Sequence, residues 1–521
     1  MLGNVCSDYH LAVVNHWVYI KMSLTTIQQF YVNKTILITG GTGFIGGYLI
    51  EKLLRSCWGI KRVYVLFRSK SKSGEESLKE VYKGLKESNP DALEKVSLIM
   101  GNLELPNLGL TDDDLERIIN EVNCVFHVGA TIKFMEKLRT AILINVGGTD
   151  SVITISKKMK NLQSFVHVST AFSHCIRNVT EEMFYSSMMD GDALLKRARS
   201  DDNHSLNEAT STILGKWPNT YVFTKHIAED LIRRKGSDMP IAIVRPSIVL
   251  APYREPESGW SSKFDINSLF VMSMNIGITH SLRCDPRAII DVVPVDLVVS
   301  QLIVAGWQIA RTWKAEGLQI FNCVSCQQNP VTWGQQEKWR NKFNSMIPSS
   351  KKVFHHFVVQ NMNTVLLYFI DLIYLPLIYL MNLRGFLFGE THIVFKIYKK
   401  MKFYCELVEY VTLKQWDFKD SNTQILWNSL EIEDKNVFNF NVKDINWENF
   451  YCNVVSGVRQ NILKDDMSSI EKARTKARLL KLFHYFMEKL RTAILINVGG
   501  TDSVITISKK MKNLQVSFLY F

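Results

Sequence analysis

The first half of the chain alternates between short apolar runs and stretches of helical periodicity. Helical patterns lie at Leu115–Glu121 and Ala141–Lys158. The apolar runs, which are typical of buried strands, are Thr35–Ile38, Val63–Phe67, Val96–Met100, Cys124–Val128, Phe165–Val168 and Ile241–Val244. Strands that alternate with helices predict an α/β fold with a doubly wound parallel sheet, whose ligands bind at the carboxyl ends of the strands.

A glycine-rich turn follows the first predicted strand. Residues 39–46 read TGGTGFIG, and a helical pattern begins at Tyr48. We expect Gly40 to permit the sharp turn, Gly43 to let the backbone approach a pyrophosphate, and Gly46 to let the helix pack against the strand. The N-terminus of that helix offers N–H groups and partial positive charge to phosphates. The Gly-x-x-Gly-x-x-Gly spacing favours a nucleotide site of the short-chain dehydrogenase/reductase type.

The end of the second predicted strand indicates which nucleotide is bound. An NAD-dependent enzyme usually has Asp or Glu there, which binds the ribose 2′-hydroxyl. This chain instead has Arg68, followed by Lys70 and Lys72. A cationic side chain would bind a 2′-phosphate, so the sequence favours NADPH. For the two lysines, an ordinary solvated surface charge is the alternative.

Tyr221 and Lys225 are four residues apart, which places them on one face of a helix. Free tyrosine has a pKa of ~10 and exchanges protons slowly at neutral pH. A nearby ammonium would lower that pKa and suit the phenol to general acid–base catalysis. A hydroxyl at Thr170 or Ser169, after the strand Phe165–Val168, would complete a Ser/Thr–Tyr–Lys site. A simple strand-end turn is the alternative for that hydroxyl.

These motifs together resemble the alcohol-forming fatty acyl-CoA reductases. The resemblance extends from about Ser23 to Asp465. Its motifs include KTILITGGTGFIG at 34–46, FHVGATIKF at 126–134, NVGGT at 145–149, VHVSTAF at 166–172, NTYVFTK at 219–225, DVVPVD at 291–296 and FNFNVKDINWENFYCNVVSGVRQNIL at 438–463. The resemblance implies an extended Rossmann domain followed by a smaller, mainly helical domain of the sterile type.

The resemblance also implies the cofactor contacts. They are Gly40, Thr42, Gly43, Phe44, Ile45, Gly46, Arg68, Asn102, Leu103, Gly129, Ala130, Lys225, Pro246 and Ser247. The chain departs from the family pattern in several places. Asn102 stands where an Asp usually meets the adenine, Gly129 and Gly147 replace residues that are usually Ala and Arg, and Phe172 replaces a usual Tyr. The expected Gly-Pro after Trp260 is missing, so the resemblance does not predict the substrate-side loop.

The activity implied by the resemblance is reduction of long-chain fatty acyl-CoA to the fatty alcohol, with two NADPH and release of CoA. Tyr221 and the Thr170 or Ser169 hydroxyl would stabilise the developing oxyanion. Lys225 would bind the ribose hydroxyls and lower the pKa of Tyr221. Two alternatives stay open. The chain could be an extended short-chain reductase with another substrate, or a catalytically inactive membrane-associated homologue.

Charge and composition limit the classes of molecule that this protein is expected to bind. The net charge of +12 fits nucleic acid, an anionic membrane or an anionic small ligand. Because the basic residues are scattered and no nucleic-acid motif is present, a phosphorylated cofactor, an acyl-CoA substrate and a membrane surface explain it better. The nine cysteines form no disulfide framework, and Cys323-Val-Ser-Cys326 lacks a second ligand pair, so we predict no metal and a reducing compartment.

The most apolar segment is Val365–Met381, interrupted by Asp371 and Pro376. We expect a monotopic or acyl-channel-lining helical hairpin rather than a membrane span. Basic residues follow it at Lys399, Lys400 and Lys402, as beside an anionic membrane surface. A buried helix is the alternative. This segment and the resemblance favour a membrane-associated protein with a cytosol-facing site, at the endoplasmic reticulum or the peroxisome.

The C-terminal end contains an unusual repeat. Residues 486–515 repeat residues 134–163 without a change, after a basic amphipathic stretch at 472–483. Two copies do not make a solenoid, which needs about three. We interpret the second copy as a duplicated coding segment or an assembly artefact. We therefore expect Asn497 and Gly499 to carry no function and the tail to be poorly packed.

Four regions are predicted along the 521 residues. They are a poorly ordered leader at 1–30, the NADP-binding domain at 31–345, the sterile-type domain at 346–465, and a basic helix with an aberrant tail at 466–521.

Overall fold

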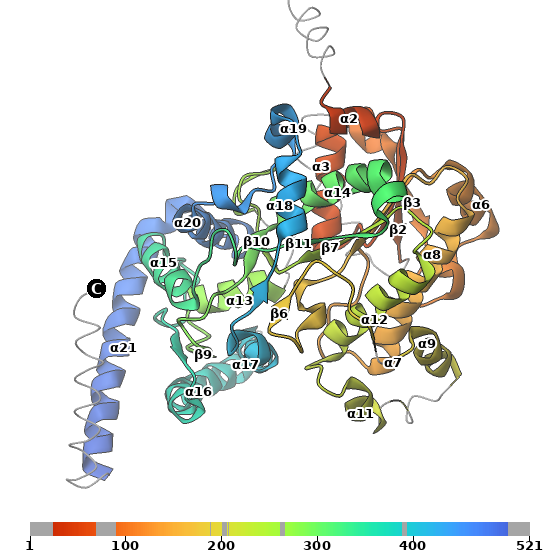
Figure 1. The fold of residues 1–521 in the computed structure, drawn as a ribbon. Coiled ribbons are helices and arrows are strands. Elements are labelled where there is room, and N and C mark those ends of the chain that lie inside the picture. The colour runs from red at the N-terminus through yellow and green to blue at the C-terminus, as the bar shows by residue number, and fades with distance from the viewer. Residues whose placement is uncertain are drawn as a thin grey trace, which may run out of the picture.

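The computed structural model describes residues 24–68, 90–187, 189–200, 206, 208–260, 266–387 and 393–498 (Figure 1). A seven-stranded parallel sheet has the order β11-β7-β5-β4-β1-β2-β3. Its strands are β1 Thr35–Thr39, β2 Arg62–Phe67, β3 Val96–Met100, β4 Cys124–His127, β5 Ser164–Val168, β7 Ile241–Pro246 and β11 Gln319–Cys323. The doubly wound fold and the six predicted strands are confirmed, whereas β11 was not predicted. The direction of winding changes between β1 and β4, where such folds bind ligands.

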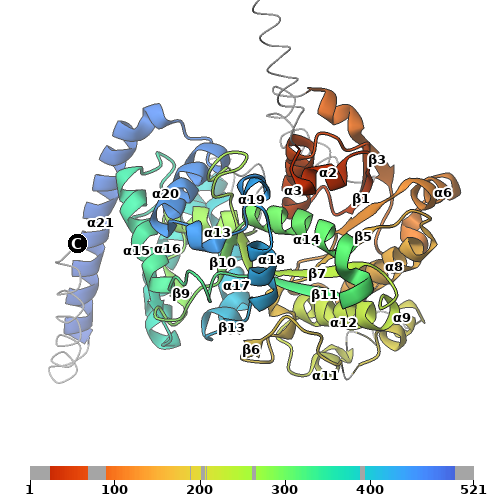
Figure 2. The same cartoon turned by 45° about the horizontal axis from the view of Figure 1, so that its top comes forward.

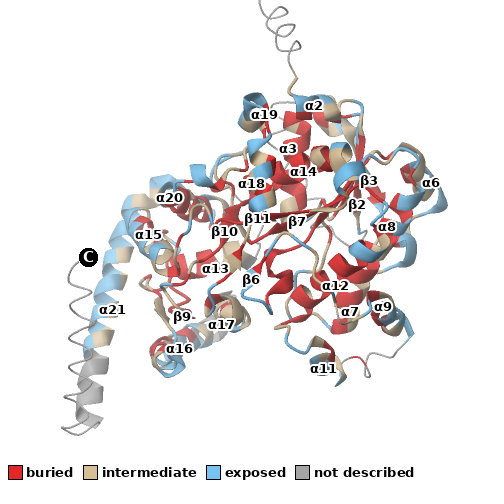
Figure 3. Cartoon of the chain, viewed as in Figure 1, coloured by how far each residue is buried: buried red, intermediate tan, exposed pale blue. Residues whose placement is uncertain are grey.

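Helices cover both faces of the sheet (Figures 1 and 2). On one face, α3 (Phe44–Ser56) packs against α14 (Val295–Glu316). On the other lie α6 (Asp112–Glu121), α8 (Gly148–Lys158) and α12 (Thr220–Lys235). Successive strand residues enter opposite cores, as in β1, where Ile36 and Ile38 join the first and Leu37 the second. The central strands are consequently buried on both sides, whereas the edge strand β3 exposes Leu98 and Met100 (Figure 3).

The predicted helix at Ala141–Lys158 contains a wider turn. It consists of α7 (Leu138–Ala141), the π-helical turn η3 (Ile142–Gly147) and α8. This turn lies inside the first copy of the repeated sequence.

Three small parallel sheets join distant parts of the chain: β8 (Ile248–Leu250) with β10 (Val292–Pro294), β9 (Ser281–Arg283) with β12 (Val359–Asn361), and β6 (Val179–Thr180) with β13 (Asp417–Phe418). The remaining helices of the first part are η1 Pro90–Lys95, η2 Pro106–Gly109, η4 Ala171–His174, α9 Gly191–Ser200, α11 Thr210–Leu214 and α13 Ile266–Asn275. Those of the mainly helical C-terminal part are α15 Trp333–Met346, α16 Thr364–Leu387, α17 Ile393–Thr412, α18 Ser421–Asn428, α19 Ile432–Val437, η5 Val442–Asp444, α20 Trp447–Gly457, η6 Val458–Ile462 and η7 Met467–Ser469.

The most apolar segment forms one helix, α16, which runs through both Asp371 and Pro376. Asp371 and Pro376 therefore interrupt the apolar sequence but not the helix, and residues 365–381 do not form a hairpin by themselves. Asp371 faces the protein, where it pairs with Lys402 of α17 and accepts a hydrogen bond from Ser281 Oγ at 2.6 Å. Among the described helices, only residues 364–383 are long and apolar enough to cross a membrane, and a quarter of that stretch is buried. Length and composition alone make this weak support for a span.

Both ends of the described chain are helical. The helix α2 (Thr26–Tyr31) begins inside the expected leader, with Ile27 and Tyr31 fully buried. The helix α21 (Ile470–Val498) includes the first residues of the second repeat copy. Most of its described side chains are exposed, and of the second copy the structure describes the side chains of residues 486–489 only. Gly499 and the residues after it lie outside the described part of the chain.

Candidate active site

The predicted glycine turn joins β1 to α3 and contacts the end of β4. Gly40 has a φ of +70°, and a Cβ placed on it would lie 2.5 Å from the Cα of Gly129. A Cβ on Gly46 would overlap the carbonyl oxygen of Gly40. Gly43 is the N-cap of α3, with no side-chain cap and no acidic residue in the first turn. A tight turn that opens onto an acid-free helix N-terminus fits a pyrophosphate.

The other predicted cofactor contacts follow the neighbouring strands. Arg68 comes directly after β2 and is exposed, whereas Lys70 and Lys72 lie outside the described residues. Asn102 and Leu103 follow β3. The Asn102 side-chain oxygen accepts a hydrogen bond from Glu104 N at 3.1 Å, and this bond stabilises the turn in which Asn102 lies.

Hydrogen bonds tie the ends of β1 and β4 together. The Thr39 hydroxyl lies 2.7 Å from His127 Nδ1 and accepts a hydrogen bond from the N–H of Gly129 at 3.1 Å. The opposite ring nitrogen of His127 lies 3.0 Å from Thr149 Oγ1. Gly129 and the adjacent Ala130 are thereby held beside the glycine turn.

Asn145, in the π-helical turn, was not predicted as a site residue. Its side chain bonds both backbone groups of Thr131, at 2.9 Å and 3.1 Å, and donates to Thr224 Oγ1 at 2.9 Å. It therefore links the loop after β4 to α12. The wider turn is the reason that a helical periodicity alone did not place it.

Tyr221 lies in the first turn of α12, whose N-cap Asn219 accepts a hydrogen bond from Val222 N at 3.0 Å. Its ring stacks on Phe134 with a centroid distance of 5.9 Å. Burial raises the pKa of Tyr221 to about 12, against a partial lowering by a hydrogen bond with the Thr170 side chain. The expected lowering by Lys225 is not found. The phenol therefore stays protonated at neutral pH.

The Lys225 ammonium is buried and donates to the carbonyl oxygen of Val168 at 2.6 Å. Burial lowers the pKa of Lys225 to about 8, although the charge of Glu229 raises it in part. The lysine is thus anchored to the end of β5 on the same helix face as Tyr221.

The two candidate hydroxyls, those of Ser169 and Thr170, have different partners. Thr170 lies with Tyr221 and also donates to the carbonyl oxygen of Pro246 at 3.4 Å. Ser169 instead donates to the buried carboxylate of Glu229. Pro246 ends β7 and Ser247 follows it, so the predicted site residues that the structure describes lie near the carboxyl ends of the strands, in the first turn of α3 or on α12.

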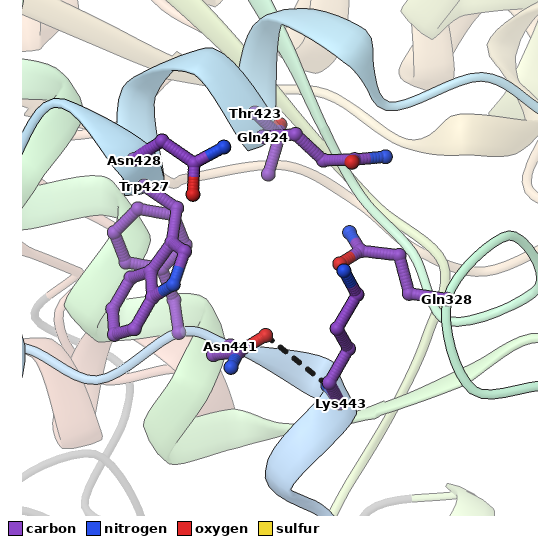
Figure 4. A pocket seen from close by; sticks show the side chains of 8 residues that line it. Gln328, Thr423, Gln424, Trp427, Asn428, Asn441 and Lys443 are labelled. Carbon is purple, nitrogen blue, oxygen red and sulfur yellow. Dashed lines mark hydrogen bonds between the residues drawn. The ribbon is translucent and has the colours of Figure 1, made fainter.

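A pocket among the described residues lies away from this edge of the sheet. A pocket of about 130 Å³ lies between α18 and η5, with Trp427, Asn428 and Lys443 in its wall (Figure 4). None of the predicted site residues lines it. We therefore base the active site on the strand ends rather than on this pocket.

Known proteins with similar sequences identify the family. Two family models, both described as male sterility protein, match residues 38–302 and 372–465. Fatty acyl-CoA reductase 1 of Rattus norvegicus is 33% identical over 469 residues, which are 89% of this chain and 91% of that protein. The chain belongs to the fatty acyl-CoA reductase family. The family member wat of Drosophila melanogaster is also 33% identical, over 88% of this chain and 90% of that protein.

Solved structures agree on the fold of this fatty acyl-CoA reductase. One of them is the reductase domain of a nonribosomal peptide synthetase from Mycobacterium tuberculosis, with a TM-score of 0.55 at 17% identity. The superposition covers 83% of this chain and 92% of that domain. The terminal R domain of the myxalamid pathway gives a TM-score of 0.54 at 18% identity, with 82% and 90% covered. At these identities the likeness concerns the fold alone.

Proposed function

We propose that this chain reduces long-chain fatty acyl-CoA to the fatty alcohol, with two NADPH and two protons consumed and free CoA released. The observation that carries the proposal is that Tyr221 pairs with Thr170, and Lys225 of the same helix bonds the end of β5, at the edge of the sheet that also carries the glycine turn. Kinship with fatty acyl-CoA reductases over most of the chain supports the substrate class.

Tyr221 is assigned the role of proton donor. Because its pKa is about 12, the phenol carries a proton that it can give to the substrate oxygen. Thr170 is the second hydrogen-bond donor to that oxygen, since Ser169 is already bonded to Glu229. Two donors aimed at one oxygen stabilise the negative charge that develops there during reduction.

The glycine turn and the N-terminus of α3 would hold the pyrophosphate, and Arg68 would bind a 2′-phosphate. Asn102 and Leu103 would contact the adenine side, and Lys225 the nicotinamide ribose. NADPH, when bound, supplies hydride. The choice of NADPH over NADH rests on Arg68, an exposed cation directly after β2.

The test measures NADPH oxidation with palmitoyl-CoA and stearoyl-CoA and identifies products by gas chromatography. We expect fatty alcohol from the wild type and at least about a 100-fold lower rate from Tyr221→Phe, because general acid catalysis contributes that much. Tyr451→Phe is the matched control, since Tyr451 on α20 is also buried and its hydroxyl has no hydrogen-bond partner among the described residues. Thr170→Ala should lose more activity than Ser169→Ala loses at equal stability. Tight NADPH binding without alcohol from any acyl-CoA would contradict the proposal.

We further propose that the edge formed by α16 and α21 binds an anionic membrane surface, with the active site facing the cytosol at the endoplasmic reticulum or the peroxisome. The two helices meet where Tyr374 stacks on His484. Their exposed apolar side chains include Val365, Tyr368, Leu372, Tyr379, Leu383, Leu479, Leu482, Phe483, Tyr485 and Phe486. Five basic residues between Lys472 and Lys481 lie on the same helix as the last five of these. A bilayer with anionic headgroups would cover the apolar groups and pair with the basic ones.

Co-flotation with vesicles tests this surface. We expect binding to phosphatidylserine vesicles, weaker binding to phosphatidylcholine vesicles, and loss of binding in Leu372→Glu/Leu383→Glu. The matched control is Ile425→Glu, whose side chain is 68% exposed on α18. Equal binding by both variants, or a concentration-dependent dimer in place of binding, would contradict it.

A further inference from the structure

Glu229 is a buried carboxylate one helical turn beyond Lys225 on α12, and it is 2% exposed. The proposed reaction does not use it directly. It nevertheless accepts hydrogen bonds from three neighbours of Thr170: from Ser169, from Ser173 Oγ at 3.0 Å, and from His174 Nε2 at 2.8 Å. The loop that carries Thr170 is therefore fastened to α12 on both sides of that residue.

Arg245 of β7 is the fixed counter-ion of this carboxylate. Its Nε and Nη2 donate to the two oxygens of Glu229 at 3.0 Å and 2.6 Å, and the guanidinium is fully buried. It also donates to the carbonyl oxygens of Glu181 and Met183, at 2.9 Å and 3.0 Å. Burial alone would raise the pKa of Glu229, but Arg245 and His174 hold it well below the usual range. Glu229 is thus a permanent anion.

We propose that Glu229 is a positioning residue of the active site: it fixes the loop that presents Thr170 to Tyr221 and places a permanent negative charge one helical turn from Lys225. The inference rests on the proposed function, because it gives Glu229 a role through Thr170 and Lys225. A carboxylate that only balanced Arg245 would not need bonds to Ser169, Ser173 and His174.

The charged and titratable groups around Lys225 make this charge measurable. Glu229 faces it from α12, His127 from β4 and His167 from β5, and Tyr221 lies one turn before it on α12. Burial, then the charge of Lys225, lowers the pKa of His127 to about 3 and that of His167 well below its usual value. Both imidazoles are therefore neutral near pH 8, as is the phenol. Lys225 is the group among these that titrates there, and Glu229 is the anion that opposes its deprotonation.

Around Glu229 itself, Arg245 and His174 make direct contacts, and His226 lies behind His174 with their Nδ1 atoms 3.2 Å apart. Burial lowers the pKa of His174, and it lowers that of His226 to about 4. Neither imidazole gains a proton near pH 8, so the environment of Glu229 is constant across the range in which Lys225 titrates.

The test compares Glu229→Gln, which removes the charge, with Glu229→Asp, which keeps it on a shorter side chain. The control is Asp230→Asn, which removes a charge from the next residue, whose carboxylate is bound to Arg233 and Arg234. The first readout is the NADPH dissociation constant from pH 6 to 9, followed by nucleotide fluorescence. The second is the pH profile of kcat/KM, and the melting temperature is recorded for each variant.

In the wild type, NADPH binding should weaken above about pH 8, where Lys225 loses its proton. In Glu229→Gln this weakening should begin about one pH unit lower, the size of shift expected for an opposite charge within one turn. Glu229→Asp and Asp230→Asn should keep the wild-type pH dependence. Glu229→Asp should lower kcat at least tenfold, because the loop around Thr170 is no longer held at the same distance.

An unshifted profile in Glu229→Gln, with activity that falls only in step with melting temperature as in Asp230→Asn, would overturn the inference. If Glu229→Gln does not fold, Glu229→Asp and Ser173→Ala carry the test, and an unchanged kcat in both overturns it. A wild type that binds NADPH but reduces no acyl-CoA contradicts the proposed function alone, since the pH dependence of NADPH binding still tests Glu229.

Discussion

Replacing Gly40 by Ala should damage the nucleotide site by a calculable amount. A left-handed φ costs a residue with a Cβ about 1–2 kcal/mol, and Gly40 has a φ of +70°. The new methyl would lie 2.5 Å from the Cα of Gly129, so that backbone must move by about 1 Å to restore an ordinary carbon–carbon contact of about 3.5 Å. Overpacking of this kind costs about 1–3 kcal/mol more.

Gly317→Ala is the matched control, because Gly317 has the same φ of +70° and no atom within 4 Å of the added methyl. Both variants should lose stability from the backbone term. Only Gly40→Ala should also displace Gly129 and weaken NADPH binding. The dissociation constant should rise about tenfold for each 1.4 kcal/mol that the steric overlap adds to the free energy of the bound state. Fluorescence titration with NADPH and thermal melting measure the two effects. A wild-type NADPH affinity in Gly40→Ala would refute the assignment of this turn to the nucleotide.

Two further predictions concern stability. Asp465 accepts hydrogen bonds from Ser349, Ser350 and Ser469, and although burial opposes it, these hold its pKa well below the usual range. A carboxylate whose pKa is depressed in the folded protein contributes stability above the unfolded pKa of about 4, and this stability is lost as the pH falls toward the folded pKa. Asp465→Asn should therefore melt at a lower temperature than the wild type at pH 7, and the difference in melting temperature should shrink below pH 4. A difference that stays constant with pH would contradict this prediction. Gly457→Ala should also lower the melting temperature, because its methyl would overlap the carbonyl oxygen of Gly259, and an unchanged melting temperature would show that this contact can relax.

Local sequence pattern was sufficient for most of the sheet and for the nucleotide turn. Buried parallel strands are short apolar runs, and each of the six predicted runs became a strand. β11 was missed because its sequence, Gln319–Cys323, mixes polar with apolar residues, although Asn322 and Cys323 are buried. The helix α16 also continues through Pro376 and packs against α17, a contact that the local sequence pattern does not contain.

The choice between Ser169 and Thr170 could not be made from the sequence. Consecutive residues at the end of an extended strand point to opposite sides, so one must meet Tyr221 and the other must face away. Which is which depends on Glu229, whose partners Ser169, His174 and Arg245 are 60, 55 and 16 residues distant along the chain. Spacing within a motif contains no information about contacts of that range.

The two copies of the repeated sequence show that identical residues can take different conformations in different places of the fold. In its first copy, Phe134 stacks on Tyr221, the backbone around Phe134 and Glu136 accepts hydrogen bonds from Thr220, and the following residues wind into a π-helical turn. In its second copy the same residues, from 486 to 498, continue an ordinary α-helix. The same letters thus take different conformations at 134–146 and 486–498, so contacts such as those with α12, and not the local sequence alone, decide the conformation. The NVGGT motif occurs twice in this chain, and finding it in a sequence is therefore not enough to place a nucleotide site.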